Sequence, residues 1–144
     1  MELVTVGAVL TYAIRLEGHS GDFYEEAASL TKAPPSREVF LSLAEARKKR
    51  QKVVERSRRE FVNEMLLEPI EGLEASDSLL EIGQSPGLDS RAVLQLAKEL
   101  EEGSQRQYGD AAARISHLPQ LARVFRKLGE GNAEHRSNLD SLSD

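Results

Sequence analysis

Apolar and small residues recur every three or four positions along two separate stretches of the chain. In the first stretch the recurrent positions are 10, 13, 17, 20, 24 and 27, which is the spacing of one face of an α-helix. The same pattern returns without a gap in the second half of the chain, where Ala92 matches Ala8 and Ala112 matches Ala28. The identical residues of the first copy are Ala8, Val9, Leu10, Ala13, Leu16, Glu17, Ser20, Tyr24, Ala27 and Ala28. The sequence therefore predicts two related helices.

Periodicity predicts four amphipathic helices in all, over about residues 5–30, 36–67, 89–115 and 119–140. Ser36 is the expected N-cap of the second helix, which is the longest of the four. Its apolar side carries Val39, Phe40, Leu43, Ala44, Val54, Phe61 and Val62.

The turns are marked by prolines and by short polar residues. Pro34 and Pro35 end the first helix, while Asp89 or Ser90 begins the third and Pro119 the fourth. Residues 68–88 are rich in proline and glycine, so we expect a long connection with a short helical turn near residues 78–82.

The connection lengths predict the topology. Short turns join the first helix to the second and the third to the fourth, so the two hairpins span about residues 5–67 and 89–140. One long crossover, about residues 68–88, joins them. This is an all-α, up-down four-helix bundle with the connectivity of ferritin-like proteins. The length of 144 residues suits one domain covering the whole chain.

The repeat continues more weakly in the second helix of each hairpin. Phe40 and Leu43 align with Phe125 and Leu128, with one extra residue in the turn that precedes the second copy. The same register aligns residues 47–50, Arg-Lys-Lys-Arg, with residues 132–135, Asn-Ala-Glu-His.

Each repeated stripe carries a carboxylate in its middle, Glu17 in the first copy and Glu101 in the second. A buried carboxylate without a partner is strongly unfavourable. Each glutamate therefore needs a metal ion, a cationic side chain or a proton.

The repeated helices, with Ala13, Glu17, Ser20, Tyr24 and Ala27 in the first copy, resemble the first and third helices of rubrerythrin-like members of the ferritin-like superfamily. The resemblance extends over nearly the whole chain. It implies a centre in which two helices each give a glutamate and the other two each give a Glu-x-x-His motif, so that four carboxylates and two imidazoles hold two iron ions.

Only part of that ligand set is present. Three positions keep a residue that can bind a metal: Glu17, Glu101 and His135. At the other three the chain has Arg47 where the resemblance implies glutamate, Arg50 where it implies histidine, and Asn132 where it implies glutamate. A guanidinium can satisfy a buried carboxylate with two charge-assisted hydrogen bonds. We therefore expect the arginines to take the place of the irons and the chain to lack a di-iron centre.

Two alternatives stay open for a metal. Glu17, Glu101 and His135 could hold a single divalent ion such as zinc, manganese or iron. Otherwise the register of the second helix could differ, or Glu45, Glu130 or Glu134 could turn inward. His135 on its own could be a core histidine bonded to Asn132 or to a glutamate.

Composition and charge exclude several classes. The chain has no cysteine, so it has no disulfides and no rubredoxin-type iron centre. Because the absence of cysteine gives no sign of an oxidising compartment, we expect a cytoplasmic protein. The N-terminus lacks a basic leader, and no stretch suits a membrane span. Residues 37–60 hold nine Lys or Arg against four Glu within a net charge of −5. Without accompanying aromatic residues, this basic run favours a solvated face beside an acidic neighbour. The alternative is a basic-helix module that docks on nucleic acid or on an acidic protein.

These observations favour a ferritin-like protein that has lost its di-iron site and serves as a binding or structural module without a cofactor. The resemblance and the small size imply a homodimer, with an unidentified protein or small ligand as a further partner. The alternative is a rubrerythrin-like metal-dependent peroxidase or ferrous-iron oxidase.

Overall fold

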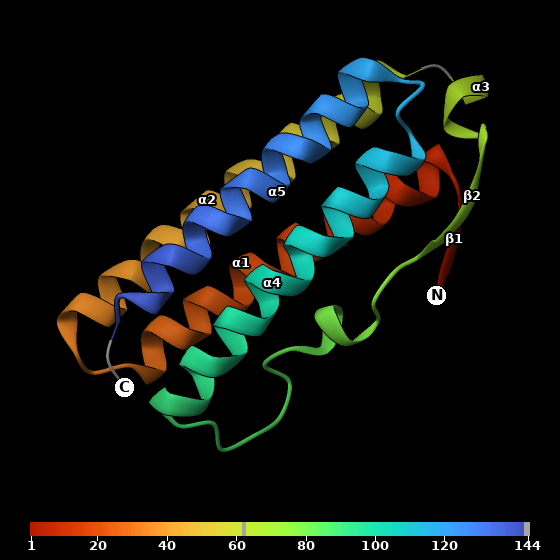
Figure 1. Ribbon diagram of the computed structural model, residues 1–144. Helices are drawn as coiled ribbons and strands as arrows, with labels where there is room; N and C mark the ends of the chain where they lie inside the picture. The colour runs from red at the N-terminus through yellow and green to blue at the C-terminus, as the bar shows by residue number, and fades with distance from the viewer. Residues whose placement is uncertain (62, 143–144) are drawn as a thin grey trace.

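The computed structural model describes residues 1–61 and 63–142. Four long helices form the bundle: α1 (Val6–Leu30), α2 (Pro34–Glu60), α4 (Ser90–Arg114) and α5 (Pro119–Asp140). Figure 1 shows two antiparallel hairpins, α1 with α2 and α4 with α5, lying side by side so that α1 is next to α4 and α2 next to α5. The predicted four-helix architecture with one long crossover is therefore observed.

The helix starts follow local capping chemistry. The Thr5 hydroxyl accepts a hydrogen bond from the backbone nitrogen of Ala8 at 3.1 Å, and the Asp89 carboxylate accepts one from Ala92 at 2.8 Å. The prediction of Ser36 as the N-cap of α2 is wrong, because α2 begins two residues earlier at Pro34 and its N-cap is Ala33. Proline suits the first turn, where a backbone N–H has no helical acceptor.

The end of the second helix also differs from the prediction. α2 stops at Glu60, Phe61 has an extended backbone, and a separate short helix, α3, covers Asn63–Leu66. The chain then turns back, so that the carbonyl of Glu68 accepts a hydrogen bond from the backbone nitrogen of Val6 at 3.0 Å. A helix continuing to Leu67 would carry the chain away from this contact. Val62, predicted on the apolar side, lies outside the described residues.

The crossover contains a strand that the sequence pattern did not predict. β2 (Pro69–Glu74) pairs antiparallel with β1 (Glu2–Thr5), with Leu3 opposite Leu73. Both leucines are buried against the end of the bundle. The predicted helical turn is present as η1, a 3₁₀ helix at Ser78–Glu81, and its Leu79 packs on Gly103 of α4.

Aromatic packing in the core follows the repeat. Tyr24 stacks on Phe40 with ring centroids 6.1 Å apart, and Tyr108 stacks on Phe125 at 5.7 Å. Tyr108 and Phe125 are the repeat counterparts of Tyr24 and Phe40. Equivalent rings therefore stack within each hairpin. Among the described residues, no helix combines the length and apolar character that a bilayer span requires.

Candidate functional site

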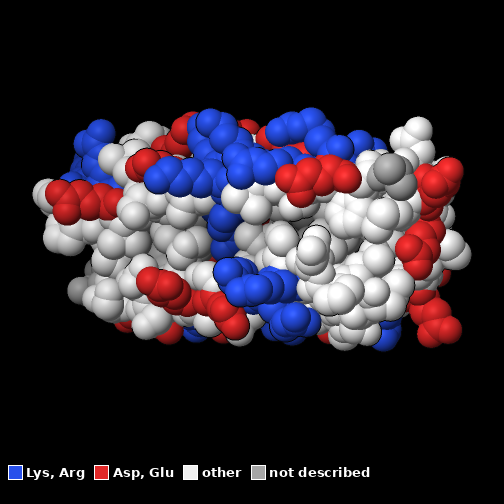
Figure 2. All heavy atoms as spheres, turned by 90° about the horizontal axis from the view of Figure 1, so that it is seen from above, with Lys and Arg blue, Asp and Glu red and all other residues white. Residues whose placement is uncertain are grey.

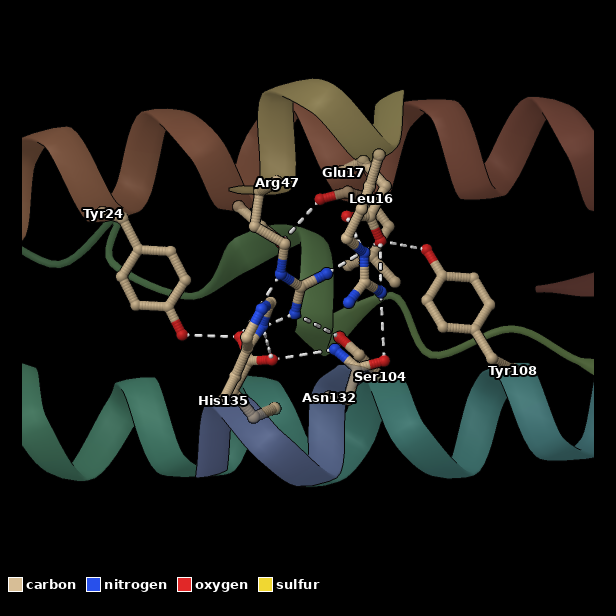
Figure 3. Close-up of polar contacts among 11 residues, drawn as sticks. Leu16, Glu17, Tyr24, Arg47, Ser104, Tyr108, Asn132 and His135 are labelled. Atoms are coloured by element: carbon tan, nitrogen blue, oxygen red, sulfur yellow. Dashed lines mark hydrogen bonds and ion pairs between the residues drawn. The ribbon is translucent and has the colours of Figure 1, made fainter. Parts of the chain in front are cut away.

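All four long helices contribute to a polar cluster at the centre of the bundle (Figure 3). Six charged or amide side chains form this cluster. Those of Glu17, Arg47, Glu101 and Asn132 are 0% exposed, and those of Arg50 and His135 are 12% and 13% exposed. The structure thus brings together all six positions that the sequence comparison selected. They are Glu17 on α1, Arg47 and Arg50 on α2, Glu101 on α4, and Asn132 and His135 on α5.

Arg47 lies between the two buried glutamates. Its Nη1 donates to Oε2 of Glu17 at 2.8 Å, and its Nη2 donates to Oε2 of Glu101 at 2.8 Å. Nη2 also donates to the hydroxyl of Ser104 at 3.0 Å. One guanidinium therefore joins α2 to both helices that carry a carboxylate.

Glu101 is the most extensively bonded group of the cluster. Its Oε2 accepts hydrogen bonds from Arg47 and from the Tyr24 hydroxyl, the latter at 2.6 Å. Its Oε1 accepts from Nδ2 of Asn132 at 2.8 Å and from His135 Nδ1 at 2.9 Å. An ionised carboxylate only accepts, so Nδ1 of His135 carries the proton in this bond.

These contacts keep the central charges ionised. Burial alone would raise the pKa of Glu101, but the charge of Arg47, followed by the hydrogen bond and charge of His135, outweighs it and holds that pKa well below its usual range. Burial likewise disfavours charged Arg47, but Glu101 and then Glu17 outweigh it and raise the pKa of Arg47 above its ordinary value. The cluster is therefore a buried ion network.

Two buried tyrosines, Tyr24 and Tyr108, donate hydrogen bonds to the two glutamates of the network. Tyr24 of α1 bonds Glu101 of α4, and the hydroxyl of Tyr108 of α4 donates to Oε2 of Glu17 of α1. Burial is the main cause that raises the pKa of both phenols well above the ordinary value, with the facing glutamate next in size. Each tyrosine is therefore a neutral hydrogen-bond donor to the carboxylate of the other hairpin.

Arg50 forms the solvent side of the network. Its Nη2 donates to Oε2 of Glu17 at 3.2 Å and to Oδ1 of Asn132 at 3.1 Å. Its Nε lies 3.0 Å from Oε1 of Glu17, yet neither atom has an aligned hydrogen bond among the described residues. We read this close contact as an ion pair, because charge attraction does not need the alignment that a hydrogen bond needs.

The residues present do not fit two iron ions. Among the described residues, no group of three or more His, Cys, Asp or Glu is placed to hold a metal ion. Arg47 contacts both carboxylates that would have to bind the metals. Glu45, Glu130 and Glu134 are all exposed, so the alternative in which one of them turns inward is not observed.

Sequence reasoning did not find every member of the network. The hydroxyl of Ser104, the repeat counterpart of Ser20, accepts a hydrogen bond from Arg47, and the sequence pattern assigns it no role. The available signal was a polar residue one helical turn after Glu101 on the same buried stripe. The equivalent Ser20 instead donates to the carbonyl of Leu16 at 2.6 Å, so the serines differ although the sequence repeats.

The fold has a solved counterpart. The chain superposes on a Thermotoga maritima protein, described as ferritin-like and diiron-carboxylate, with a TM-score of 0.73. The two share 20% identity, and the alignment covers 96% of this chain and 93% of the other. No family profile and no curated protein matches the chain. At this identity the likeness establishes the fold, so the ferritin-like fold predicted from the sequence is confirmed.

Proposed function

We propose that this chain is a metal-independent ferritin-fold module with a binding or structural role, in which an arginine–glutamate network has replaced a di-iron site. The observation that carries the proposal is the position of Arg47. Its guanidinium donates to Glu17 and Glu101 at once, at 2.8 Å in both cases. In a di-iron protein of this fold, carboxylates from these helices hold the metals.

Charge balance supports the replacement. Glu17 and Glu101 carry two negative charges, and Arg47 and Arg50 carry two positive charges, so the four side chains sum to zero without a metal. A divalent ion placed about 4 Å from a guanidinium would be repelled by about 8 kcal/mol at an effective dielectric constant of about 20. A metal would therefore have to displace Arg47 and leave that buried cation without a partner.

The same argument bears on the single-ion alternative. Glu17, Glu101 and His135 belong to one cluster, but Arg47 bridges the two glutamates, and His135 already donates to Glu101. Both candidate carboxylate ligands are thus already paired with a buried guanidinium, and His135 is bonded through Nδ1 to one of them. Binding one ion would break these contacts, which favours the metal-independent function.

The second candidate function is a rubrerythrin-like peroxidase or ferrous-iron oxidase. It is favoured by the neighbour described as diiron-carboxylate, but a shared fold transfers an activity only when the site is shared. The arginines argue against that transfer. On the resemblance and the absence of cysteine, we further propose a cytoplasmic homodimer.

Metal analysis tests the proposed function. Protein purified without chelator or affinity metal is incubated anaerobically with ferrous iron, desalted, and measured for metals by mass spectrometry. We expect no stoichiometric metal. Two irons per chain would overturn the proposal in favour of the oxidase or peroxidase, and one metal per chain would overturn it in favour of an ion at Glu17, Glu101 and His135.

A further inference from the structure

The outer face of α2 is basic over its C-terminal half. Lys48, Lys52, Arg56 and Arg59 recur every three or four residues, which places them on one side of the helix, and all four are exposed. Figure 2 shows a row of Lys and Arg with some Asp and Glu among them, and a second group of Lys and Arg beyond a largely uncharged strip. In this half of the helix, cations thus outnumber carboxylates on the surface.

The second basic group belongs to the N-terminal half of α5. Arg50 of α2 bonds Asn132 of α5, and the helices run antiparallel, so the C-terminal half of α2 lies opposite the N-terminal half of α5. Arg123 and Lys127 are exposed there, one turn apart. Together with Lys52, Arg56 and Arg59, they form what we call the basic face.

The five cations of the basic face have no carboxylate partner in the described part of the chain, unlike the neighbouring Lys48. Lys48 pairs with Glu25 of α1, but Lys52, Arg56 and Arg59 form no ion pair within residues 1–61 and 63–142. The same holds for Arg123 and Lys127 in the described part of the chain. Clustered like charges of this kind repel one another and attract an acidic partner.

Apolar side chains also reach the surface of these two helices, and Figure 2 shows a largely uncharged strip between the two basic groups. Val53 of α2 is 44% exposed, and Val124 of α5 is half-buried. This combination suits an acidic segment of another protein, which would place carboxylates against both rows and an apolar side chain on the strip between them. Protein interfaces commonly combine an apolar centre with a polar rim.

The same face is poorly suited to nucleic acid. Stacking on bases needs exposed aromatic rings, and of the chain's seven Phe and Tyr residues, six are buried and Phe61 is half-buried. The observations therefore favour a protein partner.

We propose that the basic face, formed by Lys52, Arg56 and Arg59 of α2 with Arg123 and Lys127 of α5, is the docking surface for an acidic segment of a partner protein. The inference rests on the proposed binding role and deepens it by naming the chemistry of the partner. It does not depend on the metal content of the core, because these side chains are not part of the buried network.

The test measures binding of the intact chain to fluorescent poly-L-glutamate and to a peptide of the same length in which every fourth glutamate is leucine. We expect both to bind, the leucine-containing peptide more tightly, with affinity that falls as salt is raised from about 50 to about 300 mM. The variant Lys52→Gln/Arg56→Gln/Arg59→Gln should bind about tenfold more weakly.

The matched control is Arg15→Gln/Lys32→Gln/Arg114→Gln, which removes the same charge from exposed positions elsewhere, and circular dichroism checks that both variants fold. Equal weakening in the two variants, or no peptide binding at low salt, would overturn the proposal. Tighter binding to a short DNA duplex than to either peptide would overturn it in favour of nucleic acid. If the chain bound iron and still bound the peptides, the proposed metal-independent function would be wrong, but the assignment of the basic face as a docking surface would hold.

Discussion

The hydroxyl of Tyr24 on α1 donates a hydrogen bond of 2.6 Å to Glu101 on α4, the helix that begins the other hairpin. The reciprocal bond runs from Tyr108 on α4 to Glu17 on α1. Each hairpin therefore supplies the phenol that satisfies the other hairpin's carboxylate. This exchange, together with Arg47, ties the two halves of the bundle at their centre.

Removing one carboxylate should strand a buried cation. We predict that Glu17→Leu lowers the free energy of unfolding by about 3 kcal/mol, because Arg47 and Arg50 lose a shared acceptor inside the bundle. Urea unfolding followed by circular dichroism measures the effect. Glu25→Leu, which removes an exposed partner of Lys48, is the control and should have a much smaller effect, since solvent screens that pair. Equal effects of the two variants would show that the buried pair contributes no more to stability than the exposed one.

Stability should depend on pH through Glu101. The folded state holds the pKa of Glu101 well below its unfolded value of about 4.3. Its contribution is therefore present above that unfolded value and is lost as the pH falls through the acid range. We expect the urea midpoint of the wild type to fall more steeply below about pH 5 than that of Glu101→Gln. Parallel pH profiles for the two proteins would contradict this assignment.

The tyrosines should resist ionisation while the chain is folded. Burial, then the charge of Asp77, raises the pKa of Tyr12 to about 12, and the pKa values of Tyr24 and Tyr108 lie well above their ordinary value. Their neutral forms thus contribute stability below about pH 10, and this is lost as the pH rises further. Ultraviolet titration of folded protein should show almost no phenolate near pH 10, whereas protein in urea should titrate there. A tyrosine that ionises near pH 10 in the folded chain would contradict the burial and hydrogen bonding of these phenols.

The arginines should be exchangeable for metal ligands. We predict that Arg47→Glu/Arg50→His binds iron or cobalt where the wild type does not, because Arg47 contacts both glutamates and Arg50 contacts Glu17. Cobalt absorbance and metal analysis give the readout. Lys48→Glu/Lys49→His, on the neighbouring exposed positions of α2, is the control and should bind no metal. If the Arg47→Glu/Arg50→His variant folded but bound no metal, residues 47 and 50 would not lie at metal-ligand positions.

The crossover should be sensitive to substitution where it meets α1. Gly83 has a φ of +87°, and a Cβ at this residue would lie 2.5 Å from the ring of Phe23, whereas Gly87, with a φ of +75°, has open space around it. Gly87→Ala should cost about 1 kcal/mol for the left-handed backbone alone. Gly83→Ala should cost about 1–3 kcal/mol more, because the ring must also move. Equal loss in urea unfolding would show that the crossover does not pack on Phe23.

Local sequence pattern was sufficient for the four long helices, apart from the two ends of α2, and for the selection of site positions. The three-and-four spacing around Glu17 and Glu101 predicted the buried stripes, and the register of the repeat aligned Arg47 and Arg50 with Asn132 and His135 of the other hairpin. The buried stripes depend on spacing within a single helix, and the aligned site positions depend on the repeat, so both can be recognised from the sequence alone.

Tertiary structure decided which groups meet. The pairing of Leu3 with Leu73, the end of α2 at Glu60 and the bond from Arg47 to Ser104 join residues that are distant in sequence or depend on such contacts. Their geometry is set by how the hairpins pack, and no local periodicity reports it. Sequence alone showed that each buried glutamate needed a positive partner, whereas packing placed one guanidinium between both.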